Sequence, residues 1–208
     1  MYVPRHFAVE DRDALFGLIE ARPFALMIMQ LESGLEATHL PVILDRERGP
    51  HGTLRCHVAK ANPVWKACDG NASALIVFGG QNAYISPDWY ESEQQVPTWN
   101  YAAVHATGQP RILEDAAVIG VLDDLSAQFE EKLRPKQPWT SDKLPEDFYR
   151  GMRKGIVGLE MEIQSLQGKW KLSQNKKPAD IAGAADALAA LEGEDNAAVA
   201  AMMRKALG

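Results

Sequence analysis

The chain has 208 residues and a formal net charge of -6, with 46% hydrophobic and 24% charged residues. This composition is typical of a globular protein that can bury a sizeable core, and it excludes a wholly disordered chain. The acidic balance also argues against a surface devoted to nucleic-acid phosphates, because such a surface concentrates lysine and arginine.

Targeting and redox features indicate a cytoplasmic protein. Charged side chains are spread through the first twenty residues, so we expect no secretory signal peptide there. No apolar run approaches the ~20 residues that a membrane-spanning helix needs. The two cysteines, Cys56 and Cys68, lack CxxC spacing. We therefore expect a reducing compartment, no disulfide framework and no metal site.

A β-hairpin is expected early in the chain. The apolar run 24–31 has strand length, Ser33-Gly34 is a turn signal, and 35–44 forms a second strand. Pro41 has no amide to donate, which places it at an edge or a bulge. Backbone groups near 38–41 would then be free for a ligand, although a simple edge strand is an equal alternative.

A phosphate cradle is suggested after the strand expected at 53–59. Asn62 is a good N-cap and Pro63 fits the first position of a helix. The first amides of a helix are unpaired donors, and Lys60 and Lys66 would flank them. Alternatively, this helix start and its neighbouring lysines have only a structural role.

The remaining elements follow from periodicity and turn residues. Helical spacing predicts helices over 114–133 and 144–154, and the alanine-rich segment beyond Pro178 predicts two small amphipathic helices. Strands are expected at 74–78, at 82–86 after a Gly79-Gly80 turn, at 96–113 with a bend near Gly108, and at 157–164.

The segment 84–108 is dense in aromatic residues, and we expect it to organise the molecule. In its second strand, Trp99 and Tyr101 share one face, while Asn100 lies on the other. Flat rings with polar edges suit a planar heterocyclic ligand. The same rings could instead fill a small β core or a subunit interface.

A second polar cluster follows the last strand, in the run GKWKLSQNK at 168–176. Cations and amides at a strand end suit an anionic or heterocyclic ligand. A solvated, charged tail is the alternative.

The strand count favours a mainly β protein with peripheral helices, in which six or seven strands form an antiparallel barrel. Neither GxGxxG nor GxxxxGK[ST] occurs, so a Rossmann or P-loop nucleotide site has no support.

The sequence resembles the PaiB family of FMN-binding negative transcriptional regulators. The motifs that carry the resemblance are MYVPRHF, HVAKANPVWK, YISPDWY, VPTWNYAAVHATG and GKWKLSQNK, in that order along residues 1–175. The resemblance implies a six-stranded split β-barrel of the pyridoxamine-phosphate-oxidase type. It also implies a homodimer that holds FMN at the subunit interface, and a regulatory role as a transcription repressor.

The same resemblance implies where FMN would lie. The FMN-binding domain would cover residues 1–177, with 178–208 as a helical appendage. The phosphate would sit near Lys60, Asn62 and Lys66, and the ring near 38–41 and 57–59. The implied cofactor-binding residues are Thr38, His39, Leu40, His57, Lys60, Asn62 and Lys66, with Trp99, Asn100 and Tyr101 from the partner chain, and Ser173, Gln174 and Asn175 closing the site.

Three other functions stay open at this stage. A flavin-dependent oxidoreductase or flavin reductase of the split-barrel class could use His39, His57 or His105 as acid or base. A haem-handling protein could use a histidine as axial ligand. A cofactor-free interaction module would explain the aromatic residues alone. Direct DNA binding has little support, because no helix-turn-helix with a basic recognition helix is evident.

Overall fold

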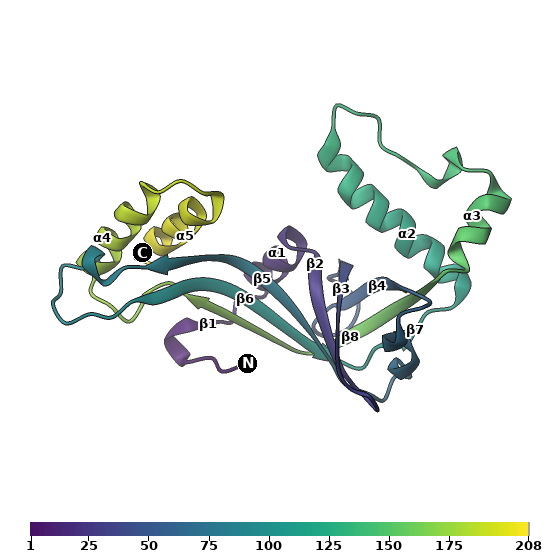
Figure 1. Cartoon of the computed structure of the whole chain (residues 1–208), viewed down its shortest axis with the longest axis horizontal. Coiled ribbons are helices and arrows are strands. Elements are labelled where there is room, and N and C mark those ends of the chain that lie inside the picture. Colours follow the sequence, from purple (N-terminus) through teal and green to yellow (C-terminus); the bar gives the residue numbers. More distant parts are fainter. Residues whose placement is uncertain (208) are drawn as a thin grey trace. The chain divides into compact units, whose positions relative to one another are not determined.

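The computed structural model describes residues 1–207 and is a mainly antiparallel β protein with peripheral helices (Figure 1). Six strands are long and two have only two residues each. In chain order the elements are β1 (Ala8–Val9), α1 (Arg12–Ala21), β2 (Phe24–Leu31), β3 (Gly34–Asp45), β4 (Thr53–Ala59), β5 (Ala74–Ile85), β6 (Thr98–Gly108), β7 (Arg111–Ile112), α2 (Asp115–Glu130), α3 (Glu146–Arg153), β8 (Ile156–Lys171), α4 (Pro178–Ala189) and α5 (Glu194–Lys205). Short 3-10 helices lie between them, among them η2 (Pro63–Ala67) and η3 (Pro87–Trp89).

The described chain divides into two compact units that are interleaved in sequence. Unit 1 comprises 1–18, 79–105 and the residues from 167 onward, and unit 2 comprises 19–78 and 106–166. The strands β5, β6 and β8 and the helix α1 contribute residues to both units.

The sheet of unit 2 is antiparallel and runs in the order β8-β4-β3-β2-β5. Helix α2 covers one face of this sheet, where Val121 and Leu125 bury themselves against Ile43. Gly158 on β8 permits the close approach, because a Cβ there would lie 2.7 Å from a methyl carbon of Val118. The glycine therefore serves packing between strand and helix.

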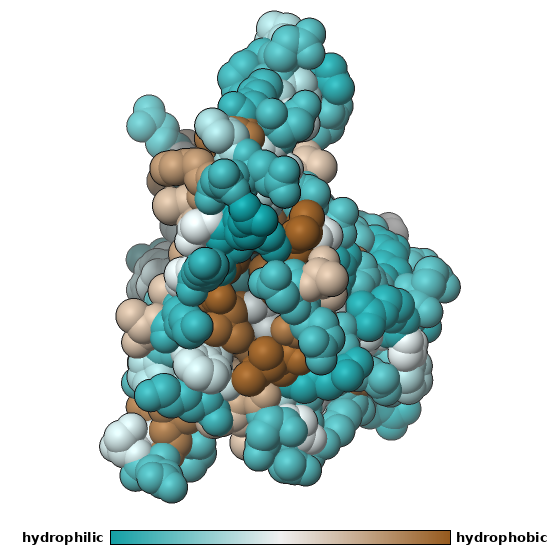
Figure 2. All heavy atoms as spheres, turned by 90° about the vertical axis from the view of Figure 1, so that its right-hand side faces the viewer, coloured by the Kyte–Doolittle hydropathy of each residue, from teal (hydrophilic) through white to brown (hydrophobic). Residues whose placement is uncertain are grey.

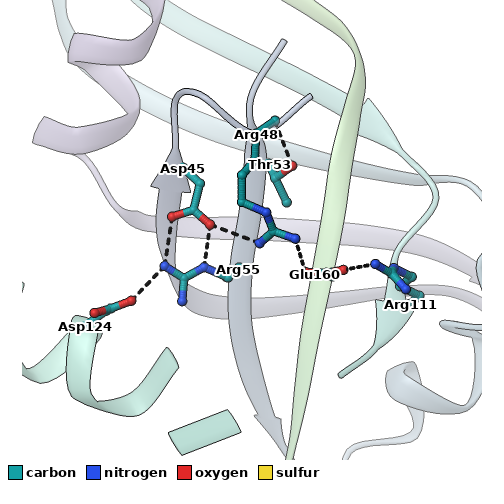
Figure 3. A network of polar contacts seen from close by, with 7 residues as sticks. All are labelled: Asp45, Arg48, Thr53, Arg55, Arg111, Asp124 and Glu160. Carbon is teal, nitrogen blue, oxygen red and sulfur yellow. Dashed lines mark hydrogen bonds and ion pairs between the residues drawn. The ribbon is translucent and has the colours of Figure 1, made fainter. Parts of the chain in front are cut away.

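A network of ion pairs ties α2 to the same sheet (Figure 3). The Arg55 guanidinium donates to both carboxylate oxygens of Asp45, at 2.6 and 2.8 Å, and to Asp124 of α2 at 2.7 Å. Arg48 joins the network through Asp45 and through the buried Glu160, at 3.2 and 2.9 Å. These contacts fix the ends of β3 and β4 relative to the helix.

The side of Figure 1 that carries α2, α3 and β7 is shown face-on in Figure 2. Most of this surface is hydrophilic, with a group of strongly hydrophobic residues near its middle. Exposed large apolar side chains on these elements are Ile112, Phe129, Phe148 and Met152, at 47%, 38%, 55% and 61% exposure.

Unit 1 builds its core around the C-terminal helices. Helices α4 and α5 pack against residues of β5, the residue after β8, and the aromatic segment. Gly183 lets α4 approach closely, since a Cβ there would lie 2.8 Å from the Trp89 carbonyl oxygen. The buried residues of this core are Ala83, Ile85, Tyr90, Leu172, Ile181, Ala184, Ala185, Leu188, Val199, Ala200 and Met203.

Most sequence predictions of secondary structure are confirmed, and four differ from the structure. The strand expected over 96–113 divides into β6, which ends at Gly108, and the two-residue β7. Strand β5 is continuous from 74 to 85, so Gly79-Gly80 is not a turn. Strand β8 runs to Lys171 rather than ending near 164. The helix after Asn62 is a five-residue 3-10 helix, although its N-cap and its proline at the first position are confirmed.

Candidate functional site

The strand β3 presents an unpaired stretch next to Pro41. On one side, residues 34–41 pair with β2 over the whole hairpin. On the other side, the pairing with β4 begins only at Val42, opposite Cys56. In an antiparallel strand alternate residues direct their backbone groups to opposite sides. Strand β3 is therefore not an edge strand. Its backbone groups before Pro41 have no strand partner on the side that faces β4, which agrees with the prediction made from the position of the proline.

Asn62 connects this stretch of β3 to the 3-10 helix η2. Its Nδ2 donates to Thr38 Oγ1 at 3.0 Å, and its Oδ1 accepts from the Val64 amide at 2.9 Å. The amide that was expected to be free for a phosphate is therefore already bonded to the cap. Any anion held here depends on side chains more than on the start of η2.

Two lysines supply the positive charge beside Asn62. Lys60 and Lys66 are both exposed, and neither ammonium group has a hydrogen bond or ion pair within the described part of the chain. The Trp65 indole donates to the Lys60 carbonyl at 2.9 Å, which fixes the backbone between the two lysines. Two unpaired cations so close in sequence are suited to attract an anion.

The sequence-predicted ring-binding residues of unit 2 lie on two faces of the sheet. Thr38 and Leu40 are buried, with 9% and 1% exposure, and point to the interior face. His39, in contrast, is exposed, and its ring stacks on Phe24 with centroids 5.8 Å apart. Only the backbone of Leu40 can therefore contact a ligand, whereas His39 can offer its side chain.

His57 faces a small cavity beneath α2. Its Nδ1 is buried and has no hydrogen-bond partner among the described residues. Burial lowers the pKa of His57, which favours the neutral imidazole. The cavity has a volume of about 200 Å³ and is lined by Pro41, His57, Leu125, Ser126, Phe129, Glu130 and Trp139. A buried nitrogen without a partner beside aromatic walls suits a flat ligand with polar edges.

The aromatic segment of unit 1 is divided between core and surface. Burial alternates along β6 as predicted, with Asn100 at 0% and Trp99 at 54% exposure. Trp99 meets Tyr84 edge to face, with centroids 6.1 Å apart. Tyr90 instead belongs to the core that packs on α4 and α5. The exposed rings are those that could stack on a ligand.

Two lysines of β8 accompany these rings, and both belong to the run GKWKLSQNK that the sequence analysis noted as a possible anion site. The Lys169 ammonium lies 5.3 Å from the Tyr101 ring centroid and 5.5 Å from that of Tyr2. Lys171 donates to Thr98 Oγ1. Their position on the strand was not predicted: the alternation of GKWK places both lysines on one face of a strand longer than expected.

Asn100 and Ser173 are brought together, but inside the core. Asn100 Nδ2 donates to Ser173 Oγ at 3.0 Å, and it contacts Met203 Sδ of α5 at 3.3 Å. Tyr90 Oη lies 3.4 Å from the same hydroxyl. Ser173 has a φ of 66°, in the left-handed region. The two residues form a buried polar network that α5 covers.

The side chain of Gln174 forms hydrogen bonds within the turn that contains this residue. Its Oε1 accepts from the Leu172 amide, and its Nε2 donates to the Trp170 carbonyl, both at 2.7 Å. Asn175, the next residue, is exposed. Of the three residues expected to close the site, only Asn175 presents its side chain freely to solvent.

Two classes of feature are missing from residues 1–207. None of the helices there is long and apolar enough to cross a membrane. No group of three or more metal-ligating side chains is close enough to hold a metal ion.

Comparison of the sequence with known proteins identifies the relatives of this chain. Residues 1–165 match the family model described as "Putative FMN-binding domain". The protease synthase and sporulation protein PAI 2 of Bacillus subtilis is 32% identical over 180 residues, covering 86% of this chain and 85% of the relative. An uncharacterized protein of Saccharomyces cerevisiae is 37% identical over 161 residues, covering 65% of this chain and 94% of that protein.

Comparison of the fold identifies flavoprotein structures. The FAD and Heme binding protein from Mycobacterium smegmatis superimposes with a TM-score of 0.57 at 16% identity, covering 79% of this chain and 73% of that one. The flavocytochrome Anf3 from Azotobacter vinelandii has a TM-score of 0.57 at 14% identity, covering 95% and 78%. These matches confirm the predicted fold class, a mainly antiparallel split-barrel type with peripheral helices. By the match over residues 1–165 and the similarity to PAI 2, the chain belongs to the FMN-binding domain family of the PaiB type, whose cofactor is FMN.

Proposed function

We propose that this protein is a cytoplasmic, PaiB-type regulator that binds FMN and acts as a homodimer. The observation that carries the cofactor site is the pair of unpaired lysines, Lys60 and Lys66, on either side of Asn62. They would hold the FMN phosphate as charged donors. The unpaired backbone of β3 before Pro41 and the side chains of His39 and His57 would receive the ring.

The partner subunit would supply the stacking surface. Trp99 and Tyr101 are the aromatic side chains on the outer face of β6, and Asn175 is exposed after β8. Asn100 and Ser173 would support these residues from the core rather than touch FMN. We propose residues 1–177 as the FMN-binding part, and the helices of 178–208 as an addition beyond the residues 1–165 that match the family, which completes the core of unit 1.

The regulatory role would be indirect. PAI 2 of Bacillus subtilis is named for protease synthesis and sporulation, and its similarity over most of both chains supports a regulatory role here. The net charge of -6 disfavours a surface that binds DNA phosphates. We therefore expect no selective gel shift with promoter DNA at physiological salt, with or without FMN. A selective shift would establish direct repression instead.

The phosphate assignment is tested by FMN titration of Lys60→Gln and Lys66→Gln. Each lost charged contact should cost about 1.5–3 kcal/mol, or roughly a tenfold to hundredfold rise in Kd. Lys132→Gln is the matched control, since Lys132 is an exposed lysine of the same unit, whereas Lys154 lies beside Lys60, whose amide donates to the Gly155 carbonyl at 2.8 Å. Circular dichroism should show an unchanged fold. If both variants bind FMN like the parent, the assignment is wrong.

A flavin-dependent oxidoreductase is the second candidate, and the cavity at His57 favours it. Bound FMN would supply the electron transfer. His57 would hold a hydrogen bond to a ligand through the Nδ1 that now lacks a partner. Reduction of bound flavin by NADH or NADPH under anaerobic conditions, slowed in His57→Phe, would support this function. A flavin that neither nucleotide reduces would contradict it.

A further inference from the structure

Unit 1 contains a cavity that the FMN site does not use. It lies where α5 meets the end of β8 and the start of α1, and its volume is about 340 Å³. Pockets of roughly 300–1,000 Å³ with mostly apolar walls are typical small-molecule sites. The lining residues are Val9, Asp11, Ala14, Trp170, Leu172, Gln174, Met202, Lys205 and Ala206.

The walls of this cavity are held by contacts on each side. The Gln174 amide bonds to the Leu172 amide and the Trp170 carbonyl, which fixes the turn after β8. Helix α5 is anchored in the core by Val199 and Met203, both at 0% exposure. The cavity is thus built before a ligand arrives, which reduces the ordering cost of binding.

The polar groups of the cavity suit a ligand that accepts hydrogen bonds. The Lys205 ammonium has no ion pair or hydrogen bond to the rest of residues 1–207, and neither has the indole Nε1 of Trp170. The one acidic residue in the wall, Asp11, already accepts from the Asp13 amide at 3.0 Å at the start of α1. The lining therefore contains two donors without partners in residues 1–207, beside the bonded side chains of Asp11 and Gln174 and the apolar residues.

We propose that this cavity binds a small aromatic carboxylate. The ring would pack on Trp170 and on the Met202 thioether, since both side chains offer favourable contacts to an aromatic ring. The carboxylate would accept from Lys205, and the Trp170 indole could donate to the same group. An ammonium ligand fits less well, because it would meet Lys205.

This cavity shares no lining residue with the proposed FMN site. Met202 and Lys205 lie at the end of α5 and Ala206 follows it, beyond the residues 1–165 that match the FMN-binding family. Trp170 and Gln174 lie on β8 and the turn after it, while the FMN phosphate is assigned to residues of unit 2. The cavity would thus give this chain a second ligand, suited to a regulatory protein that responds to an aromatic acid.

The test is calorimetric titration of the full-length protein, saturated with FMN, with 2-naphthoate. The uncharged analogue 2-naphthalenemethanol is titrated in parallel. We expect saturable binding of the acid and about tenfold weaker binding of the alcohol, as for one charged hydrogen bond. Lys205→Gln should remove this preference, whereas Lys177→Gln, an exposed lysine of the same unit, should keep it.

A second variant separates the cavity from the charge. Ala206→Trp fills the space and should abolish binding of both compounds, with the fold checked by circular dichroism. No saturable binding of the acid to the parent overturns the proposal, and so does an equal affinity for the alcohol. Competition between 2-naphthoate and FMN, measured on protein without added cofactor, would also overturn it, because the two sites would then be one.

Discussion

The side chain of Asn62 joins the open stretch of β3 to η2. Its amide nitrogen donates to Thr38 Oγ1 at 3.0 Å, while its oxygen caps the Val64 amide at 2.9 Å. One residue thus holds the two segments that carry the proposed ring and phosphate contacts. The two bonds use different atoms of the amide, so substitutions can change the charge at this position while an oxygen still accepts from the Val64 amide.

Asn62→Asp should keep the cap and reverse the bond to Thr38. The carboxylate still accepts from Val64, it can accept from the Thr38 hydroxyl instead of donating to it, and it places a negative charge beside the FMN phosphate. We expect the free energy of unfolding in urea to fall by less than about 1 kcal/mol, while FMN affinity falls at least as much as in Lys60→Gln. Asn62→Ala should instead cost about 1–2 kcal/mol of stability, because it also removes the cap. Parent-like FMN affinity in Asn62→Asp would contradict the phosphate assignment.

Gly80 and Gly79 should differ sharply when each is replaced by alanine. A Cβ at Gly80 would lie 2.7 Å from Leu18 Cδ1 and 2.9 Å from the Ala102 carbonyl oxygen, whereas a Cβ at Gly79 meets nothing within 4 Å. Overpacking of this kind typically costs about 1–3 kcal/mol. Urea unfolding should therefore show a clear loss for Gly80→Ala and a change within about 0.5 kcal/mol for Gly79→Ala. Similar losses in both variants would contradict the close packing at Gly80.

The same glycine pair shows where sequence reasoning about the fold reaches its limit. Strands β2 and β4 were predicted with their observed bounds, because their apolar runs end at turn residues. Gly79-Gly80 also has the composition of a turn, but Gly80 is needed for close approach to Ala102, far away in sequence. Local patterns cannot distinguish a glycine that turns the chain from one that lets two segments touch.

The candidate site was predictable where the chemistry is local. The cap at Asn62, the flanking lysines and the free stretch before Pro41 all follow from neighbouring residues. Asn100 and Ser173 are polar residues in a family motif, so the sequence placed them at the ligand. Their burial depends on Met203, more than 100 residues after Asn100, and no local pattern reports such a contact.

Stability should fall on acidification, in part through Asp45. Burial alone would raise the pKa of Asp45, but hydrogen bonds and charges from Arg55 and Arg48 outweigh it, so that the pKa lies below its ordinary value of 3.8. The carboxylate therefore contributes stability at pH values above the unfolded-state pKa, and this contribution is lost as pH falls through the folded-state pKa. Between pH 7 and pH 3, the free energy of unfolding in urea should fall less for Asp45→Asn than for the parent. At pH 7 the variant should already be less stable than the parent. Parallel pH profiles would exclude this contribution.

Cys56 and Cys68 should be inert in the folded protein. Burial raises the pKa of both thiols to about 12, and their exposures are 4% and 1%. Since the thiolate is the reactive form, 5,5′-dithiobis(2-nitrobenzoate) at pH 8 should release little thionitrobenzoate from the native protein. The unfolded protein should release two equivalents per chain, matching its two cysteines. Rapid native-state labelling would show that these positions open to solvent.

Asn100 and Trp99, adjacent on β6, should have opposite effects when replaced by alanine. Asn100→Ala leaves the Ser173 hydroxyl without its closest partner in a buried network, so unfolding in urea should become easier by about 1–3 kcal/mol. Its FMN affinity, measured well below the unfolding transition, should stay near that of the parent. Trp99 is 54% exposed, so Trp99→Ala should change stability little but weaken FMN binding, because the proposed stacking surface is lost. If Asn100→Ala instead weakens FMN binding without a loss of stability, the Asn100 side chain contacts the cofactor, and the buried network must open when FMN binds.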